Sequence, residues 1–288
     1  MILEETYTLT NGVEIPKLGL GTWLITDTDV TQAVKDAVTT GYRHIDTAQA
    51  YGNEHGVAEA IRNSGVSRDE IFLTTKLAAE IKSYEQAVQA IDESLKTTRL
   101  DHLDLMIIHS PQPWAEFGAE DRYFEGNREA WRALEEAYHA GKLRAIGVSN
   151  FEREDLDNIL AACTVRPMAN QVLAHISNTP HELIRYAQEQ EMLVEAYSPI
   201  AHGELLKNER VREIAETYDA TVPQLSNRYV LQLGLVALPK TANAEHMKSN
   251  ADVDFEISEE DMETLKTIDQ IADYGEHSVF PVYAGTRN

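Results

Sequence analysis

The sequence predicts a (β/α)8 TIM barrel, because short apolar runs of β type alternate with amphipathic helical stretches along the whole chain. Eight such units in about 250 residues match the size of this fold. The alternation implies parallel strands joined by helical crossovers. We expect a single domain over residues 1–288, since no low-complexity linker, further repeat or break in composition divides the chain.

Each barrel element is predicted from a local pattern. The predicted strands are Leu18–Leu20, His44–Asp46, Phe72–Lys76, Leu103–His109, Ala145–Ser149, Ala169–Leu173, Leu193–Tyr197 and Val236–Pro239. Helical periodicity predicts helices between them, among them Val30–Thr40, Tyr84–Thr97, Arg128–Ala140, Arg153–Ala162 and Pro180–Glu189. An extra C-terminal helix, Ser258–Ile268, follows the eighth unit, and the tail Asp269–Asn288 has an irregular pattern.

A β-hairpin is predicted ahead of the first unit. Thr6–Thr10 and Val13–Pro16 flank Asn11-Gly12, a pair that tolerates the positive φ values of a tight turn. We expect this N-terminal β-hairpin to plug the bottom of the barrel. A doubly wound sheet is the rival fold, but Gly19–Trp23 lacks the third glycine of a dinucleotide fingerprint and leads into no immediate helix.

The amino-acid composition indicates the class of protein and its cellular compartment. Hydrophobic residues make up 43% and charged residues 25% of the chain, as in ordinary globular proteins. Cys163 is the one cysteine, so an intramolecular disulfide is excluded and a reducing compartment is indicated. The opening MILEETYTLT has no basic segment followed by an apolar run, and no apolar stretch approaches about 20 residues. We therefore expect a cytoplasmic protein.

Charge excludes two classes of partner. Asp and Glu number 48 against 25 Lys and Arg, which gives a formal net charge of −23. Such a field repels nucleic acid phosphates and anionic lipids, so we expect neither nucleic acid nor membrane as a partner. An anionic cofactor would need a local cationic site.

Chemically active side chains stand at successive predicted strand ends, where barrels carry their active sites. Asp46, Lys76 and His109 end the second, third and fourth strands, and Tyr51 follows in the loop after Asp46. A lysine ammonium close to a phenol favours the phenolate and lowers the phenol pKa. Asp46 would hold the lysine, and His109 would hydrogen-bond a carbonyl oxygen. This set predicts an acid that protonates an oxygen as it gains negative charge, which carbonyl reduction requires.

Each of these residues also has a structural explanation when taken singly. Asp46 and Lys76 fit a barrel salt bridge, His109 fits a satisfied core histidine, and Ser149-Asn150 fits a helix cap. Those explanations give no reason for Asp, Tyr, Lys and His to meet at one barrel mouth. We therefore favour the catalytic interpretation.

Six motifs in order resemble the aldo-keto reductase superfamily, with the closest likeness to the microbial branch of diketogluconate and methylglyoxal reductases. The likeness spans roughly residues 5–275. The motifs are Gly41–Glu54, Leu73–Lys76, Asp104–His109, Gly147–Phe151, Tyr197–Pro199 and Leu238–Thr241. One such motif alone is weak, whereas six in register are highly specific.

The resemblance implies roles for these residues. Tyr51 is the general acid, Lys76 and Asp46 tune it, and His109 orients the carbonyl of a small aldehyde, ketone or α-dicarbonyl. The implied cofactor is NADPH: Ser149, Asn150 and Gln171 grip the nicotinamide carboxamide, and Tyr197 stacks on the ring. The other implied cofactor-binding residues are Gly21, Thr22, Ser198 and, at the adenosine end with its 2′-phosphate, Lys240, Thr241, His246 and Asn250. A monomer is expected.

Two residues depart from the family pattern. His246 stands where the family usually has an arginine, so a partly charged imidazole replaces a permanent bidentate cation. We expect NADPH to be preferred, with NADH also accepted. Ser110 replaces the tryptophan that usually follows the catalytic histidine, which predicts a wider substrate pocket walled by Trp114 and Trp23.

Other classes of function are less well supported. A redox sensor that binds cofactor but turns over slowly is disfavoured by the complete set of four catalytic residues. A barrel glycosidase needs a second carboxylate facing Asp46, and no trusted candidate is present. No metal is expected, because His55, His175 and His181 lack ligand spacing. The loops 110–126, 201–206 and the tail from Tyr274 shape the pocket, and the short tail predicts an open one.

Overall fold

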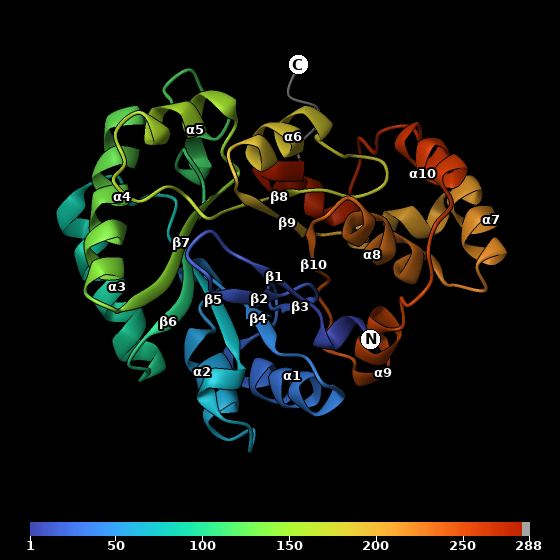
Figure 1. The fold of residues 1–288 in the computed structure, drawn as a ribbon, viewed down its shortest axis with the longest axis horizontal. Helices are drawn as coiled ribbons and strands as arrows, with labels where there is room; N and C mark the ends of the chain where they lie inside the picture. Colours follow the sequence, from blue (N-terminus) through green and yellow to red (C-terminus); the bar gives the residue numbers. More distant parts are fainter. Residues whose placement is uncertain (284–288) are drawn as a thin grey trace.

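A computed structural model of the chain describes residues 1–283. Eight parallel strands follow one another around a central barrel in chain order, and helices surround them (Figure 1). The strands are β3 (Gly19–Gly21), β4 (His44–Asp46), β5 (Phe72–Leu77), β6 (Leu103–Ile108), β7 (Leu143–Ser149), β8 (Ala169–Leu173), β9 (Leu193–Tyr197) and β10 (Val236–Leu238). Parallel bridges from Leu18 to Ala237 and from Gly21 to Lys240 join the first strand to the last. The predicted barrel is confirmed.

Helices cover the outside of the barrel. They are α1 (Asp27–Thr40), α2 (Glu54–Arg62), α3 (Tyr84–Thr98), α4 (Phe124–His139), α5 (Arg153–Leu160), α6 (His181–Glu189), α7 (Glu209–Thr217), α8 (Val222–Gln232), α9 (Ala244–Ala251) and α10 (Glu259–Lys266). The helix α10 is the predicted extra C-terminal helix. Local sequence sets the ends of such helices: for α1, the Thr26 hydroxyl accepts a hydrogen bond from the Asp29 amide, and Gly41 ends the helix at φ 114°.

Two helices begin earlier than their periodicity predicts, α1 at Asp27 instead of Val30 and α4 by four residues. The helix α4 starts at Phe124 rather than Arg128, and its first turn contains Gly126, which weakens the helical signal. A Cβ at Gly126 would lie 2.7 Å from the Cβ of Lys82. Glycine is therefore required there by the close approach of the neighbouring loop, not by helix propensity.

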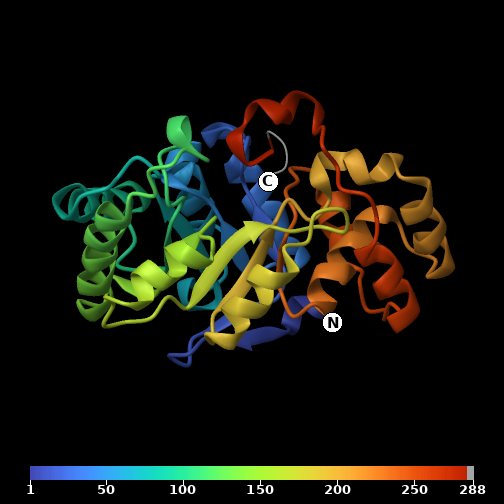
Figure 2. The same cartoon turned by 90° about the horizontal axis from the view of Figure 1, so that it is seen from above.

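The N-terminal hairpin closes the amino-terminal end of the barrel. Strands β1 (Thr6–Thr8) and β2 (Glu14–Pro16) pair in antiparallel fashion, as predicted. Leu9 and Ile15 are buried in one cluster with barrel residues such as Leu105 and Ile107. In the view of Figure 2 the hairpin (dark blue) lies below the barrel, and the C-terminal segment (red) crosses the opposite end.

The barrel interior changes from apolar to polar along the strands. The buried polar side chains of the barrel strands include His44 at the start of β4 and, further along their strands, Asp46, Thr74, Lys76, Gln171 and Glu195. Gly19 makes room for this layer, since a Cβ there would lie 2.8 Å from Nδ1 of His44. The absence of a side chain at Gly19 thus permits an imidazole in the barrel centre.

The C-terminal tail is more ordered than the predicted irregular segment. It forms the 3-10 turns η6 (Gly275–Val279) and η7 (Pro281–Tyr283), while the last part of the predicted tail, 284–288, lies outside the described residues. The Tyr274 hydroxyl lies 2.9 Å from Nε2 of His175, and the Tyr283 hydroxyl lies 2.7 Å from Oγ of Ser198. These two hydrogen bonds hold the tail across the carboxyl end of the barrel.

Candidate active site

A cavity of about 420 Å³ opens at the carboxyl ends of the strands, a volume typical of small-molecule sites. Most of the residues that the sequence predicts for the site line this cavity. They are Gly21, Thr22, Trp23, Asp46, Tyr51, His109, Trp114, Ser149, Asn150, Gln171, Tyr197, Ser198 and Lys240. The structure therefore brings together residues from the ends of seven of the eight strands, all but β5, or from the loops that follow them.

A buried ion pair lies at the floor of the cavity. Lys76 is 1% exposed, and its Nζ donates to Oδ1 and Oδ2 of Asp46 at 2.7 and 2.9 Å and to the Thr47 carbonyl at 2.9 Å. Burial alone lowers the pKa of Lys76, but the Asp46 carboxylate more than offsets it, so that the pKa lies above its usual value. Lys76 is thus a fixed cation.

Tyr51 lies between this cation and the cavity, in the 3-10 turn η2 (Gln49–Tyr51). Its hydroxyl is 3.4 Å from Nζ of Lys76. Burial raises the pKa of Tyr51 and the nearby ammonium lowers it, and the net direction is upward. The predicted lowering of this pKa is therefore wrong in its net sign, because burial outweighs the lysine. The phenol stays protonated at neutral pH, which a proton donor requires.

His109 faces the same cavity as a neutral ring. Burial, with a smaller contribution from Lys76, holds the pKa of His109 well below its usual range. Its ring meets Tyr51 edge-on at 5.7 Å between centroids, and Trp114 at 5.0 Å. Within residues 1–283 its buried Nδ1 has no hydrogen-bond partner. A neutral imidazole beside the phenol can donate one N–H to a carbonyl oxygen.

A group of amides and hydroxyls forms one side of the cavity. Ser149 Oγ donates to the Gln171 carbonyl at 2.8 Å, and Asn150 Nδ2 donates to the His109 carbonyl at 3.0 Å. The Tyr197 hydroxyl donates to Oδ1 of Asn150 at 2.7 Å. Asn150 has φ 59°, a left-handed conformation that asparagine adopts more readily than most residues. This chain of bonds ties three strand ends to His109.

Three of the predicted adenosine-end residues lie outside the cavity lining. Thr241 is buried and its hydroxyl accepts from the Asn243 amide, His246 is exposed on α9, and Asn250 is buried on the same helix. Lys240 is exposed and lines the cavity. Lys240 therefore supplies a cation to the cavity from the segment that follows β10.

The substrate walls differ from the predicted set at one position. Trp23 and Trp114 line the cavity, but Ser110 does not. Ser110 is fully buried, and its carbonyl accepts a hydrogen bond from Lys82 Nζ at 2.9 Å. The backbone turns away after His109, so the side chain of Trp114, not that of Ser110, borders the histidine.

The sequence analysis expected the loop 201–206 and the tail from Tyr274 to shape the pocket, but it named no lining residue in either segment. His202, His277, Phe280 and Tyr283 line the cavity. Phe280 packs edge-on to Trp23 at 4.7 Å between ring centroids, so the tail covers part of the cavity that the short tail was expected to leave open. The sequence does contain a signal for the three tail residues: aromatic rings recur every three residues, at 277, 280 and 283, a spacing that suits packing on one surface.

A buried carboxyl group was also missed. Glu195 precedes Tyr197 by two residues on β9, so both side chains point into the barrel. Alternation along the strand gives this signal once Tyr197 is placed in the site. Within residues 1–283, no group of three or more His, Cys, Asp or Glu side chains is arranged to hold a metal ion. No helix in that range is long and apolar enough to cross a membrane.

The mouth of this barrel gathers a lysine–aspartate pair, a protonated tyrosine and a neutral histidine, a set of side chains suited to acid–base chemistry. Residues 17–270 match the Aldo/keto reductase family, and the chain belongs to this family of oxidoreductases. Members of the family use NAD(P)H, so the enzyme acts on carbonyl compounds with a nicotinamide cofactor.

Named relatives and solved structures agree with this assignment. The chain is 42% identical over 270 residues to a glyoxal reductase of Bacillus subtilis (strain 168), covering 93% of this chain and 94% of the relative. An aldo/keto reductase structure from Brucella melitensis superposes with a TM-score of 0.85 at 36% identity, covering 92% and 99% of the two chains. An aldo-keto reductase of Bombyx mori in complex with NADP gives 0.84 at 30% identity, covering 97% and 98%.

Proposed function

We propose that the enzyme is an NADPH-dependent reductase of small aldehydes, ketones and α-dicarbonyls, with Tyr51 as general acid. The observation that carries this proposal is the Tyr51 hydroxyl, 3.4 Å from an ammonium that Asp46 holds in place, at the wall of a cavity that His109 also lines. The similarity to a glyoxal reductase supports α-dicarbonyls as part of the substrate range.

In this proposal, each of the four residues at the barrel mouth has its own role in carbonyl reduction. When bound, the nicotinamide supplies the hydride. His109 donates a hydrogen bond to the carbonyl oxygen and orients it, and Tyr51 gives its proton to that oxygen as negative charge develops. Lys76 stabilises the phenolate that remains, and Asp46 keeps Lys76 charged and aimed at Tyr51.

The cavity suits the proposed cofactor. Ser149, Asn150 and Gln171 offer amide and hydroxyl groups to a carboxamide, and the Tyr197 ring borders the same wall. Gly21, Thr22 and Ser198 form neighbouring parts of the lining, and exposed Lys240 provides a cation for an anionic group. Thr241, His246 and Asn250 complete the adenosine end in this proposal. NADPH is preferred and NADH is accepted, because a histidine at 246 clamps a 2′-phosphate less firmly than an arginine.

Three further properties complete the proposal. The enzyme is a single domain over residues 1–288, works as a monomer, and resides in the cytoplasm. The single Cys163 supports the cytoplasmic assignment, and the continuous closure of the barrel from β3 to β10 supports the single domain. Trp23 and Trp114 select the substrate by walling the space beside His109.

A steady-state assay of NADPH absorbance tests the function. We expect oxidation of NADPH with glyoxal, methylglyoxal and simple aldehydes, and slower oxidation of NADH with the same substrates. Binding of NADPH without turnover on such a panel would instead indicate a redox sensor. Equal rates with both cofactors would refute the cofactor preference while leaving the carbonyl reductase intact.

A further inference from the structure

A second carboxyl group lies beside the catalytic ion pair, inside the barrel. Glu195 is wholly buried on β9. Its Oε2 accepts a hydrogen bond from Gln171 Nε2 at 3.2 Å, and its Oε1 lies 3.8 Å from Nε2 of His44. The proton transfers proposed above do not use Glu195, so its presence in the barrel centre needs a separate account.

The charges around Glu195 do not balance if it is ionised. The titratable groups that face it are His44 and Asp46 on β4 and Lys76 on β5, while β8 contributes the neutral Gln171 and β10 the apolar Val236. Lys76 is already paired with Asp46 at 2.7 Å. An ionised Glu195 would therefore be a second buried negative charge without a cation of its own, which is costly.

The pKa directions agree with this count. Burial, together with the Asp46 carboxylate, raises the pKa of Glu195 to about 8. Burial lowers the pKa of His44 to about 4, so the imidazole is neutral and cannot act as a counter-ion. The proton at neutral pH therefore resides on Glu195, and Lys76 and Asp46 remain the only charged pair of this buried layer.

Glu195 and Asp46 together fix one amide. The two hydrogens of Gln171 Nε2 point to Oδ2 of Asp46 at 3.0 Å and to Oε2 of Glu195 at 3.2 Å. Ionised Asp46 only accepts hydrogen bonds, so the nitrogen end of the amide must face it. The carbonyl oxygen of Gln171 is then the end that can accept a hydrogen bond from a ligand in the cavity that Gln171 lines.

We infer that Glu195 is a positioning residue that, while protonated, orients Gln171 toward the nicotinamide carboxamide and, once ionised, places a negative charge beside the nicotinamide site. This inference rests on the proposed function. The oxidised nicotinamide ring is cationic and the reduced ring is neutral, so ionisation of Glu195 favours the oxidised cofactor. The enzyme thereby couples pH to its relative affinity for NADP⁺ and NADPH.

Equilibrium binding tests the inference without turnover. Dissociation constants for NADP⁺ and NADPH are measured from pH 6.5 to 9.5 by quenching of tryptophan fluorescence, since Trp23 and Trp114 line the cavity. In the wild type the affinity ratio should shift toward NADP⁺ by roughly three- to tenfold as pH rises, the effect of a pKa difference of about half to one unit between the two complexes. In Glu195→Gln the ratio should stay constant.

Two further variants separate charge from structure. Glu195→Gln keeps a neutral group with an oxygen for Gln171, so at pH 6.5 it should bind both cofactors within about threefold of the wild type. Glu195→Leu removes that acceptor and should weaken both about tenfold. Glu54→Gln is the matched control, because Glu54 is another buried carboxyl with a raised pKa, bonded to Thr75 and Ser94. It should keep the pH-dependent ratio of the wild type.

Each outcome decides between the proposals. A wild-type affinity ratio that does not change with pH would overturn this inference alone, and that measurement stands even if the variants fail to fold. The same shift in Glu195→Gln as in the wild type would also overturn it. Failure of the wild type to bind either cofactor would overturn the proposed function together with this inference.

Discussion

Replacing Tyr51 with phenylalanine should separate catalysis from folding and from cofactor binding. The ammonium of Lys76 has three hydrogens, and Oδ1 and Oδ2 of Asp46 and the Thr47 carbonyl accept them at 2.7, 2.9 and 2.9 Å. The Tyr51 hydroxyl, at 3.4 Å, is a fourth and longer contact. The phenyl ring keeps its place 4.9 Å from Nζ. Loss of the hydroxyl should therefore change the free energy of unfolding by less than about 1 kcal/mol.

The rate of reduction should fall far more. A positioned general acid contributes about 10²–10⁴-fold, equivalent to roughly 3–5 kcal/mol of activation free energy. The assay follows NADPH absorbance at saturating methylglyoxal, with thermal unfolding and cofactor-induced fluorescence quenching measured on the same sample. Tyr229→Phe is the control. Tyr229 lies on α8, outside the cavity lining, and its hydroxyl is 3.0 Å from the hydroxyl of Thr179. Turnover of Tyr51→Phe within threefold of the wild type, with NADPH bound normally, would refute the assignment of the proton donor.

Three other perturbations test separate parts of the site. His246→Arg should tighten NADPH by at least about threefold more than NADH, by completing a cationic clamp for the 2′-phosphate, and equal gains in the two dissociation constants would exclude that contact. Burial disfavours the imidazolium form and holds the pKa of His109 well below its usual range. The value of kcat/KM should therefore show no inflection near pH 6.5 when the pH is lowered to about 5.5. A loss of half of kcat/KM over this interval would contradict a neutral His109. Asp46→Asn leaves Lys76 buried without its counter-ion. The free energy of unfolding should fall by about 3–5 kcal/mol and the Tm by about 5–8 °C. An unchanged Tm would mean that Lys76 loses its charge at little cost.

Local sequence patterns predicted most of the fold and the residues at the centre of the site. Each strand is a short apolar run between turn residues, and in a barrel the carboxyl ends of all strands meet at one mouth. Placing Asp46, Lys76 and His109 at three such ends therefore predicted their proximity without any long-range information. Side chains alternate along a strand with a period of two, so the inward placement of Tyr197 could also have identified Glu195, which the sequence analysis did not name.

The parts that the sequence did not predict depend on non-local packing. Trp23 and Phe280 are far apart in sequence, and their contact follows from the path of the tail after Tyr274, which His175 anchors from another loop. The net pKa direction of Tyr51 is a balance between burial and a single ammonium, and only the packed structure gives the burial. The sequence predicted the effect of the Lys76 ammonium on the pKa of Tyr51, but not the larger effect of burial in the opposite direction.

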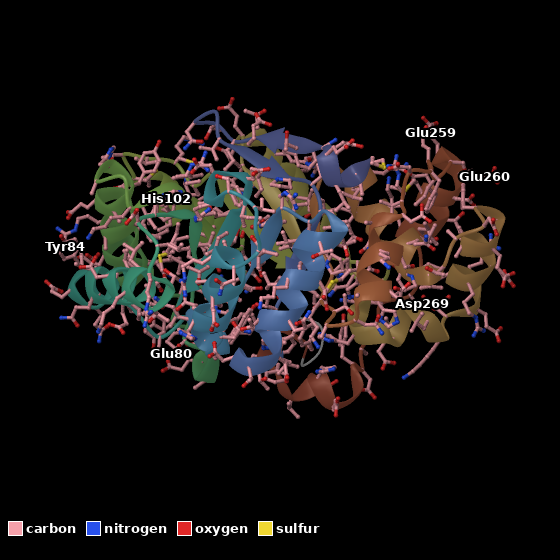
Figure 3. The ribbon with its side chains drawn as sticks, turned by 90° about the horizontal axis from the view of Figure 1, so that it is seen from below. Glu80, Tyr84, His102, Glu259, Glu260 and Asp269 are labelled. Atoms are coloured by element: carbon pink, nitrogen blue, oxygen red, sulfur yellow. The ribbon has the colours of Figure 1, made fainter. Side chains whose placement is uncertain are left out.

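The excess of acidic residues and the binding of an anionic cofactor are compatible because the two concern different surfaces. Exposed carboxylates such as Glu259 and Glu260 project outward from the helical layer (Figure 3). Most surface lysines, including Lys248 on α9, pair with such acids. Lys240, by contrast, is exposed at the cavity and has no ion pair within residues 1–283. A cofactor phosphate placed at this point, as proposed, would meet a cation that no carboxylate already neutralises, so local charge, not the net charge of −23, would govern its binding.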